Sequence, residues 1–251
     1  DNALVYLDKL IRRDRKSSDA SAAIVIGKEI YAAKGDADGL VYWLKSIGES
    51  IPEAALDSIS YNAGRNHYLD QDCKTSIADF EKYIQKYPDG IFITQANFYK
   101  AECNYKASNT DAALAGYAAV ISKNKNEFTE LALTYASEIA FDKKNYTVAL
   151  DYYKQLELNA ENPKNNTTAK IGIMRCDYEV KDYTGAIDYA AKVMSMDKAG
   201  IELINEAHYI TAKSYLALNK TEEALIEFKM LASAAKDETG AEASYNIAAI
   251  Q

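Results

Sequence analysis

A small residue followed directly by a branched aliphatic residue recurs along the whole chain at nearly constant intervals. The seven pairs begin at Ala3, Gly39, Ser76, Ala113, Ala149, Ala186 and Ala224, so the spacing is 36 to 38 residues. A second set of mostly small residues recurs between these pairs and after the last one: Gly27, Gly64, Ala101, Ser137, Met174, Ala212 and Ala248. A period of about 20 to 50 residues is typical of repeat architectures. The repeat therefore constrains the fold before any single element is assigned.

Large side chains accompany the small ones at helical spacing. Four residues after the first set come Leu7, Trp43, Phe80, Tyr117, Tyr153 and Phe228, with Ala190 as the exception. Four residues after the second set come Tyr31, Tyr68, Tyr105, Phe141 and Tyr178. An i, i+4 pair lies on one face of a helix, so each period contains two helices joined by a short polar turn. Small residues let two helix axes approach closely, and stacked hairpins supply the core that one hairpin lacks.

The composition agrees with a helical, folded chain and excludes two classes of partner. Of 251 residues, 48% are hydrophobic, and only 3 are Pro and 11 Gly, which leaves few of the residues that turns and sheets require. The net charge of −8 gives no source for the phosphate neutralisation on which nucleic-acid binding depends. No apolar run reaches the roughly 18 residues of a spanning helix. We therefore expect neither nucleic-acid binding nor direct membrane insertion.

These features resemble the tetratricopeptide repeat (TPR) family, in which small residues and aromatics occupy fixed places and a proline such as Pro88 closes the repeat. The chain departs from the family in its longer period. The resemblance implies an all-α fold, a right-handed α-solenoid or superhelix of stacked antiparallel helix hairpins. We expect one array over residues 1–251: a half repeat over 1–18, full repeats over 20–55, 57–92, 94–128, 130–165, 167–203 and 205–239, and a half repeat over 241–251.

Residues 83–90 and 96–102, with Tyr105, look most like TPR proteins of bacterial cell envelopes. This narrower resemblance favours a periplasmic location over a cytoplasmic one. Cys73, Cys103 and Cys176 are odd in number and far apart, so we expect no disulfide framework and no zinc site, only small buried side chains. Three free thiols would be unusual in an oxidising compartment, which keeps a cytoplasmic location open.

In TPR structures the fifth, ninth and twelfth places of a repeat face the concave groove, and their spacing makes one helical stripe. Every ninth place here is charged. The candidate partner-binding residues on the stripe are Tyr61, Arg65, Tyr68, Phe98, Glu102, Tyr105, Glu138, Phe141, Arg175, Tyr178, Tyr209 and Lys213. Rigid rings and fixed charges suit peptide recognition. The alternative is that the aromatics at the twelfth place pack between neighbouring hairpins, while Arg65 pairs with Glu102 and Glu138 with Arg175.

The sequence offers no set of residues for catalysis or for binding a metal or cofactor. His67 and His208 lie 141 positions apart, which leaves no bis-histidine site or serine triad, and we expect both to be structural. Residues 36–39 resemble part of a calcium loop, but the loop positions that need carboxylates hold lysines. Acidic residues in turns, such as Asp70 and Asp72, are explained by helix capping. We expect no enzymatic activity.

Two functions stay open at this point. The first is a non-enzymatic interaction scaffold that binds a peptide or protein in its groove. The second is an architectural spacer or assembly module of a larger cell-envelope protein, acting through its ends or its convex face. Because half repeats lie at both ends, we expect apolar surface there and end-to-end self-association.

Overall fold

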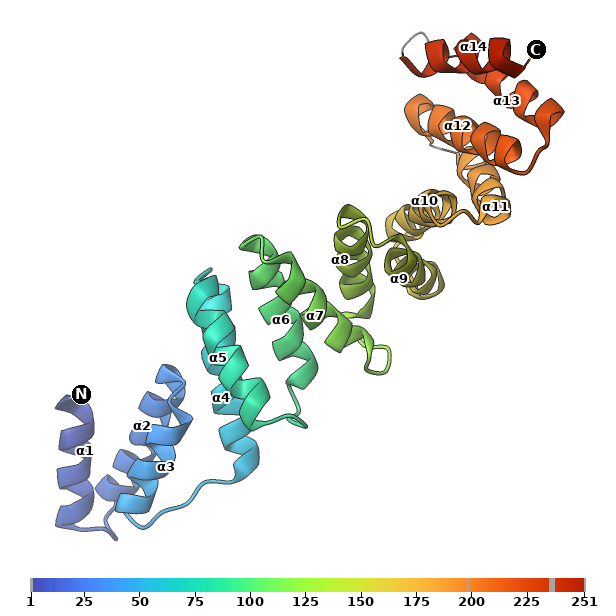
Figure 1. The fold of residues 1–251 in the computed structure, drawn as a ribbon. Helices are drawn as coiled ribbons and strands as arrows, with labels where there is room; N and C mark the ends of the chain where they lie inside the picture. Colours follow the sequence, from blue (N-terminus) through green and yellow to red (C-terminus); the bar gives the residue numbers. More distant parts are fainter. Residues whose placement is uncertain (1, 198, 235–237, 251) are drawn as a thin grey trace. The chain divides into compact units, whose positions relative to one another are not determined.

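The structure, a computed structural model, describes residues 2–197, 199–234 and 238–250, and these form fourteen α-helices and no strand. Within residues 2–121, and again within residues 129–250, consecutive helices pack on one another and are joined by short connections (Figure 1). The predicted all-α class of stacked antiparallel hairpins is confirmed. None of the helices in these ranges is both long and apolar enough to cross a membrane.

The chain divides into two compact units, residues 1–124 and 125–251. The first unit contains α1 (Asn2–Arg13), α2 (Ser18–Lys34), α3 (Ala37–Ser46), α4 (Glu53–Leu69), α5 (Cys73–Lys86), α6 (Ile93–Lys106) and α7 (Thr110–Ile121). The second contains α8 (Thr129–Asp142), α9 (Tyr146–Asn159), α10 (Pro163–Glu179), α11 (Tyr183–Met194), α12 (Ile201–Ala217), α13 (Thr221–Ala234) and α14 (Glu238–Ile250). A single continuous array with the repeat ranges given above stays a prediction.

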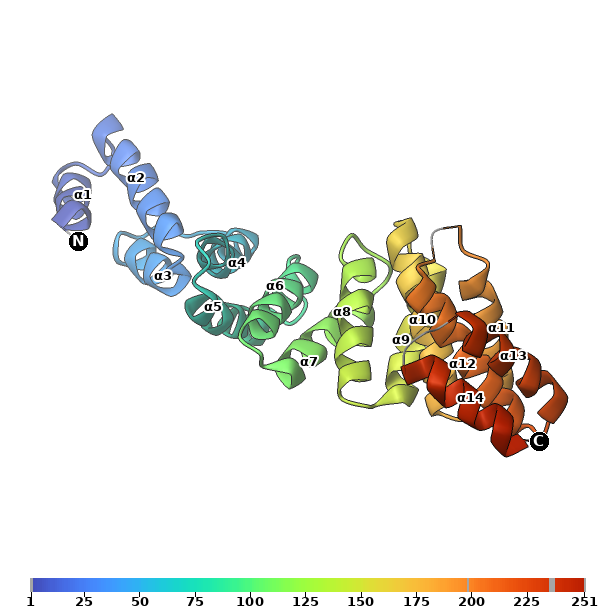
Figure 2. The same ribbon diagram turned by 90° about the horizontal axis from the view of Figure 1, so that it is seen from above.

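Each unit is built by the same packing rule. Each helix packs on its neighbour in the chain, as α4 packs on α5 and α9 on α10, and both views show these pairs side by side (Figures 1 and 2). The first helices of successive hairpins also contact each other: α2, α4 and α6 in the first unit, and α8, α10, α12 and α14 in the second. The first helices therefore form one layer of each unit.

The turn inside each hairpin has a residue in the left-handed backbone region. In the first hairpin that residue is Gly35, with φ 65°, which a residue without Cβ adopts at no steric cost. In the other five hairpins it is not glycine: Gln71, Ser108, Lys144, Lys181 and Asn219 have φ between 59° and 67°. The next residue often caps the second helix, as Asp72 does by accepting from the backbone N–H of Thr75 at 3.2 Å.

The small residues lie where hairpin helices meet. Ala101, Ser137, Ala212, Ala113, Ala149, Ala186 and Ala224 are all fully buried. Gly64 shows why the position must be small, because a Cβ there would lie 2.8 Å from Cδ1 of Phe80, which is itself fully buried. Ala3 and Ala248, at the two ends of the pattern, are exposed. The periodic sequence pattern thus marks the helix-to-helix contacts of the core.

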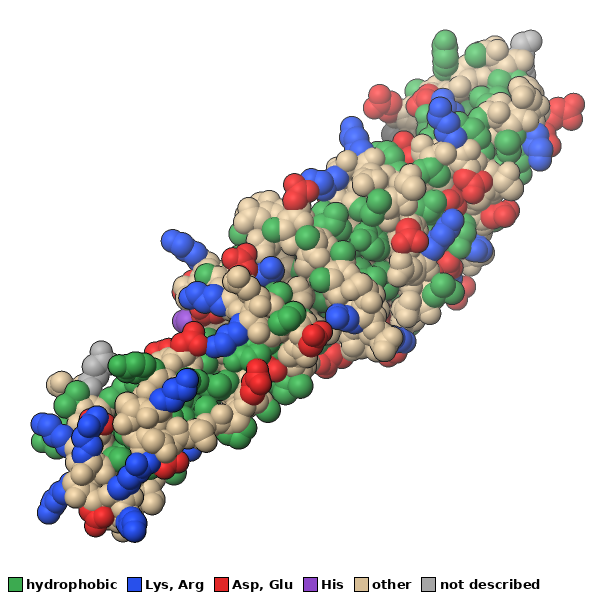
Figure 3. Space-filling view, turned by 60° about the horizontal axis from the view of Figure 1, so that its bottom comes forward, with side chains coloured by type: hydrophobic (Ala, Val, Ile, Leu, Met, Phe, Trp, Pro, Cys, Tyr) green, Lys and Arg blue, Asp and Glu red, His purple; other side chains and the backbone are tan. Residues whose placement is uncertain are grey.

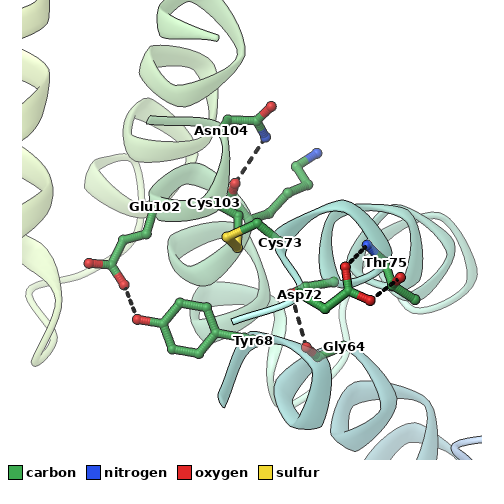
Figure 4. Close-up of a disulfide and its surroundings, with 10 residues drawn as sticks. Gly64, Tyr68, Asp72, Cys73, Thr75, Glu102, Cys103 and Asn104 are labelled. Atoms are coloured by element: carbon green, nitrogen blue, oxygen red, sulfur yellow. Dashed lines mark hydrogen bonds between the residues drawn. A yellow bond between two sulfur atoms is a disulfide. The ribbon is translucent and has the colours of Figure 1, made fainter. Parts of the chain in front are cut away.

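The prediction that all three cysteines are free is wrong for two of them. Cys73, the first residue of α5, and Cys103, in α6, form a disulfide with a Cα–Cα distance of 5.0 Å (Figure 4). The bond links one hairpin to the next. Cys176 is a free, buried thiol as expected, and burial raises its pKa to about 12.

Candidate functional site

A cavity of about 580 Å³ opens in the second unit, between the first helices of three successive hairpins and α9. Its lining residues are Glu138, Phe141 and Asp142 from α8, Tyr153 from α9, Thr168, Ile171, Gly172 and Arg175 from α10, and Leu203 from α12. Three residues of the predicted stripe therefore meet at this cavity, although they come from two different hairpins. The volume lies within the range of about 300–1,000 Å³ that is typical of ligand pockets.

The wall formed by Tyr153 depends on the absence of a side chain at Gly172. A Cβ on Gly172 would lie 2.5 Å from the ring of Tyr153, so only glycine lets this ring pack flat against α10. The Tyr153 hydroxyl is hydrogen-bonded to Ser137, and burial raises the pKa of the phenol to about 12. The ring thus supplies a fixed wall, with its polar tip already satisfied inside the protein.

Glu138 has no hydrogen-bond or ion-pair partner within the described ranges, although it is half-buried in the cavity. Burial raises the pKa of its carboxyl, and the neighbouring charge of Asp142 raises it further. Both effects disfavour the ionised form. The cavity therefore holds a carboxylate without a counter-ion.

Arg175 does not neutralise Glu138, because its guanidinium is occupied elsewhere. Its Nε and Nη2 donate to the two carboxylate oxygens of Glu206 at 2.6 and 2.7 Å. This bidentate pair raises the pKa of Arg175 and fixes the orientation of the planar group. The ladder pair between Glu138 and Arg175, considered from the sequence, is thus not formed.

The last predicted residues of the stripe lie around Glu242 in α14. Tyr209 donates to Glu242 Oε1 at 2.7 Å, and Lys213 Nζ lies 3.8 Å from the same oxygen. Desolvation and the bond to Glu242 both raise the pKa of Tyr209. Tyr178 is half-buried, and its ring lies edge-on to Tyr183 at 6.1 Å. Tyr209 and Lys213 thus connect neighbouring hairpins, whereas the Tyr178–Tyr183 contact lies within one hairpin.

Glu206 and Glu242 were not predicted as partners of the stripe. Both occupy the second place of the repeat that follows their basic partner, so the ladder runs from a ninth place to the next second place. The acidic second places were visible in the sequence and could have indicated this ladder.

In the first unit, two of the predicted groove residues belong to the core. Tyr61 is buried, and its ring stacks on Phe92 with centroids 4.3 Å apart. Phe98 is also buried and lies edge-on to Tyr117 at 6.0 Å. Both rings, at fifth places of the repeat, pack between helices, and neither presents a surface to a partner.

Two other stripe residues of the first unit, Tyr68 and Glu102, lie beside the disulfide (Figure 4). Tyr68 donates to Glu102 Oε2 at 2.5 Å, so Glu102 is tied to the preceding hairpin by a tyrosine and not by Arg65. Arg65 is exposed, and Tyr105 is 39% exposed. The predicted pair of Arg65 with Glu102 is thus absent. A covalent link and a hydrogen bond instead join α5 and α4 to adjacent residues of α6.

Basic residues are concentrated at the beginning of the chain, in α1 and the segment after it: Lys9, Arg12, Arg13, Arg15 and Lys16, all exposed. Figure 3 shows several basic side chains at this end of the chain. Asp8 pairs with Arg12 at 2.7 Å, and Glu49 lies 3.7 Å from Arg15. Part of this positive charge is therefore neutralised within the chain.

The two histidines each contact one carboxylate across a hairpin. His67 Nδ1 lies 2.8 Å from Asp79 Oδ2, and His208 Nδ1 lies 2.6 Å from Glu227 Oε2. In the described part of the chain, no group of three or more histidine, cysteine, aspartate or glutamate side chains is arranged to hold a metal ion. Asp36, from the calcium-like segment, instead caps α3 by accepting from Gly39 N–H at 2.8 Å.

Comparison with known proteins agrees with the repeat assignment over one hairpin. Residues 59–90, from within α4 to just after α5, match the tetratricopeptide repeat family. No curated protein sequence matches the chain. The segment that matches the family is therefore also a helical hairpin in the structure, formed by α4 and α5.

Several solved structures resemble the chain at low identity. The TPR domain of P58(IPK) is 13% identical with a TM-score of 0.41, over 93% of this chain and 67% of that one. Yeast Tom70 is 15% identical with a TM-score of 0.44, over 99% of this chain and 58% of that one. A STAND protein with a tetratricopeptide repeat sensor from Pyrococcus horikoshii is 18% identical with a TM-score of 0.42, over 99% of this chain and 40% of that one.

Proposed function

We propose that the chain is a non-enzymatic protein-protein interaction scaffold that binds a peptide or protein segment in the groove lined by its first helices. The observation that supports this most directly is the cavity at Glu138, Phe141 and Arg175. These residues come from α8 and α10, and they were selected from the sequence as one binding stripe. Their convergence on a cavity of ligand-pocket size favours recognition over a purely structural role.

The experiment is a selection of random peptides displayed on phage against the folded chain. Thr168, half-buried at the cavity, is changed to tyrosine to fill it, and Leu158, exposed on α9, is changed to glutamate as the matched control. We expect enriched peptides to lose binding to Thr168→Tyr and to keep binding to Leu158→Glu, with unchanged helicity in both variants. Enrichment that ignores Thr168→Tyr, or no enrichment at all, would contradict the proposed groove.

A second candidate function, an assembly module acting through its ends or its convex face, is favoured by α1. Val5 is 55% exposed and Tyr6 is 70% exposed, so this helix presents apolar side chains to its surroundings. Such a face suits association with another copy or with further helices. Sedimentation velocity over a range of concentrations tests this candidate, and Tyr6→Glu should then weaken the association.

The location we propose is an oxidising compartment, in agreement with the resemblance to bacterial cell-envelope proteins. The Cys73–Cys103 disulfide supports it, because such bonds persist outside the reducing cytosol. With two of the three thiols paired, the main reason for a cytoplasmic location is removed. A count of free thiols in protein isolated from its native source under alkylating conditions tests the compartment.

A further inference from the structure

The cavity between α8, α9, α10 and α12 has an excess of negative charge in its lining. Its charged lining residues are Glu138, Asp142 and Arg175. Because Arg175 is held by both oxygens of Glu206, its positive charge is already compensated. Glu138 and the exposed Asp142 are not compensated, so the cavity is acidic in its net effect on a ligand.

The position of Glu138 makes a counter-ion valuable there. Its carboxylate is half-buried and unpartnered within the described ranges, and burial disfavours its ionised form. An ammonium or guanidinium group that enters the cavity restores the favourable Coulomb energy that solvent no longer supplies in full. A ligand carboxylate, in contrast, would meet two like charges and would have to displace Glu206 from Arg175.

The apolar walls suit the stem of a long basic side chain. Phe141, Ile171 and Leu203 are half-buried around the cavity, and the fixed ring of Tyr153 closes one side. Lysine and arginine combine an apolar stem with a charged head and therefore fit a site with apolar walls and an acidic group. The combination distinguishes this cavity from a surface cluster of acidic residues, which has no walls.

We propose that this cavity receives a lysine or arginine side chain from a segment of a partner protein, with the cationic head paired to Glu138 and the stem packed against Phe141 and Leu203. The proposal rests on the proposed function, because it names the chemistry that the groove selects. Glu138 is the specificity-determining residue. Asp142, at the rim, adds attraction for the same charge.

The experiment is an NMR titration of the full chain with single-residue probes. The probes are the Nα-acetyl N-methylamides of lysine and arginine, with that of norleucine as the uncharged control. The variants are Glu138→Gln and, as the matched control, Asp188→Asn, which changes an exposed acid on α11 outside the cavity. Thermal unfolding verifies that both variants fold, and we expect Glu138→Gln to be at least as stable as the original because it removes a partly buried, uncompensated charge.

We expect saturable shifts of the amide signals of residues 138, 142, 172 and 175 with lysine, arginine or both, and none with norleucine. Glu138→Gln should weaken the binding about fivefold, the size expected for one partly exposed ion pair, while Asp188→Asn leaves it unchanged. Equal binding to Glu138→Gln, or saturable norleucine binding, would overturn the proposal. So would loss of the same signals with protein concentration alone, since a second copy would then occupy the cavity.

The outcomes separate this proposal from the broader one. If Thr168→Tyr abolishes binding of selected peptides but Glu138→Gln does not affect the lysine and arginine probes, the groove binds a partner without the proposed charge selection. If the probes bind as expected but no peptide is selected, the cavity chemistry is correct and the scaffold function fails.

Discussion

The disulfide between Cys73 and Cys103 gives the sharpest test of how the first unit is held together. Its half-cystines lie 30 positions apart, and closing a loop of that length lowers the entropy of the unfolded chain. By the loop-entropy relation this stabilises the fold by about 3.6 kcal/mol at 25 °C. Reduction should therefore remove a large share of a unit's stability, since whole domains are stable by only about 5–15 kcal/mol.

The assay is urea unfolding with and without dithiothreitol, followed by the fluorescence of Trp43. This residue is the single tryptophan of the chain and is buried in the first unit, so its signal reports that unit. We expect reduction to lower the free energy of unfolding from this signal by about 3 to 4 kcal/mol. Circular dichroism reports both units, so part of its unfolding transition should keep the same urea midpoint after reduction.

Two controls make the result decisive. Cys176→Ala removes the free thiol, and reduction should destabilise this variant as much as the original chain, because Cys176 lies outside the disulfide. A thiol assay of denatured, unreduced protein should find one reactive thiol per chain, against three after reduction. Three thiols before reduction, or a Trp43 transition that dithiothreitol leaves in place, would refute the stabilising role of the bond.

Three further substitutions test the core, the turns and a buried charge. Gly64→Ala should lower the midpoint of thermal unfolding, because the clash with Phe80 costs about 1–3 kcal/mol and the better helix propensity returns only about 1 kcal/mol. Lys144→Gly should raise the free energy of urea unfolding by about 0.5–1 kcal/mol, because its φ of 59° strains any residue with a Cβ; an unchanged midpoint would contradict this. Burial raises the pKa of Asp177 to about 6 from 3.8, so ionisation should destabilise the fold as pH rises from about 4 to 6, by up to about 3 kcal/mol. Asp177→Asn should accordingly raise the unfolding temperature at about pH 8 but not at about pH 4, and an equal gain at both would disprove the effect.

The sequence predicted the fold well because its pattern is a direct record of helix contacts. Positions such as Ala113 and Ala186 are small since a neighbouring helix lies against them, and they are fully buried as that requirement implies. The groove residues stay a prediction; helical spacing places Glu138 and Phe141 on one face of α8, but it does not fix how Arg175 of the next hairpin lies beside them.

Contacts between hairpins were harder to predict, because they depend on how one repeat is shifted against the next. Cys103 lies one period after Asn66, and Asn66 is near the turn that leads to Cys73. Cys103 and Cys73 can therefore meet when one hairpin stacks on the next, but the spacing within one hairpin does not indicate that they do. The pairing of Arg175 with Glu206 was missed for the same reason. The repeat pattern predicts a groove position for Tyr61, because its place in the repeat does not distinguish a ring on the surface from one that stacks on Phe92.

The left-handed turn inside the hairpins determines where this protein tolerates changes in length. In all six hairpins the paired small positions, such as Gly64 and Ser76 or Ser137 and Ala149, are twelve residues apart, whereas the distance to the next hairpin varies. An inserted residue in a turn such as that at Lys144 would rotate the second helix by about 100° and turn its small face away from its partner. A short peptide tag should therefore be accepted between α7 and α8, and the same tag in an internal turn should unfold its hairpin.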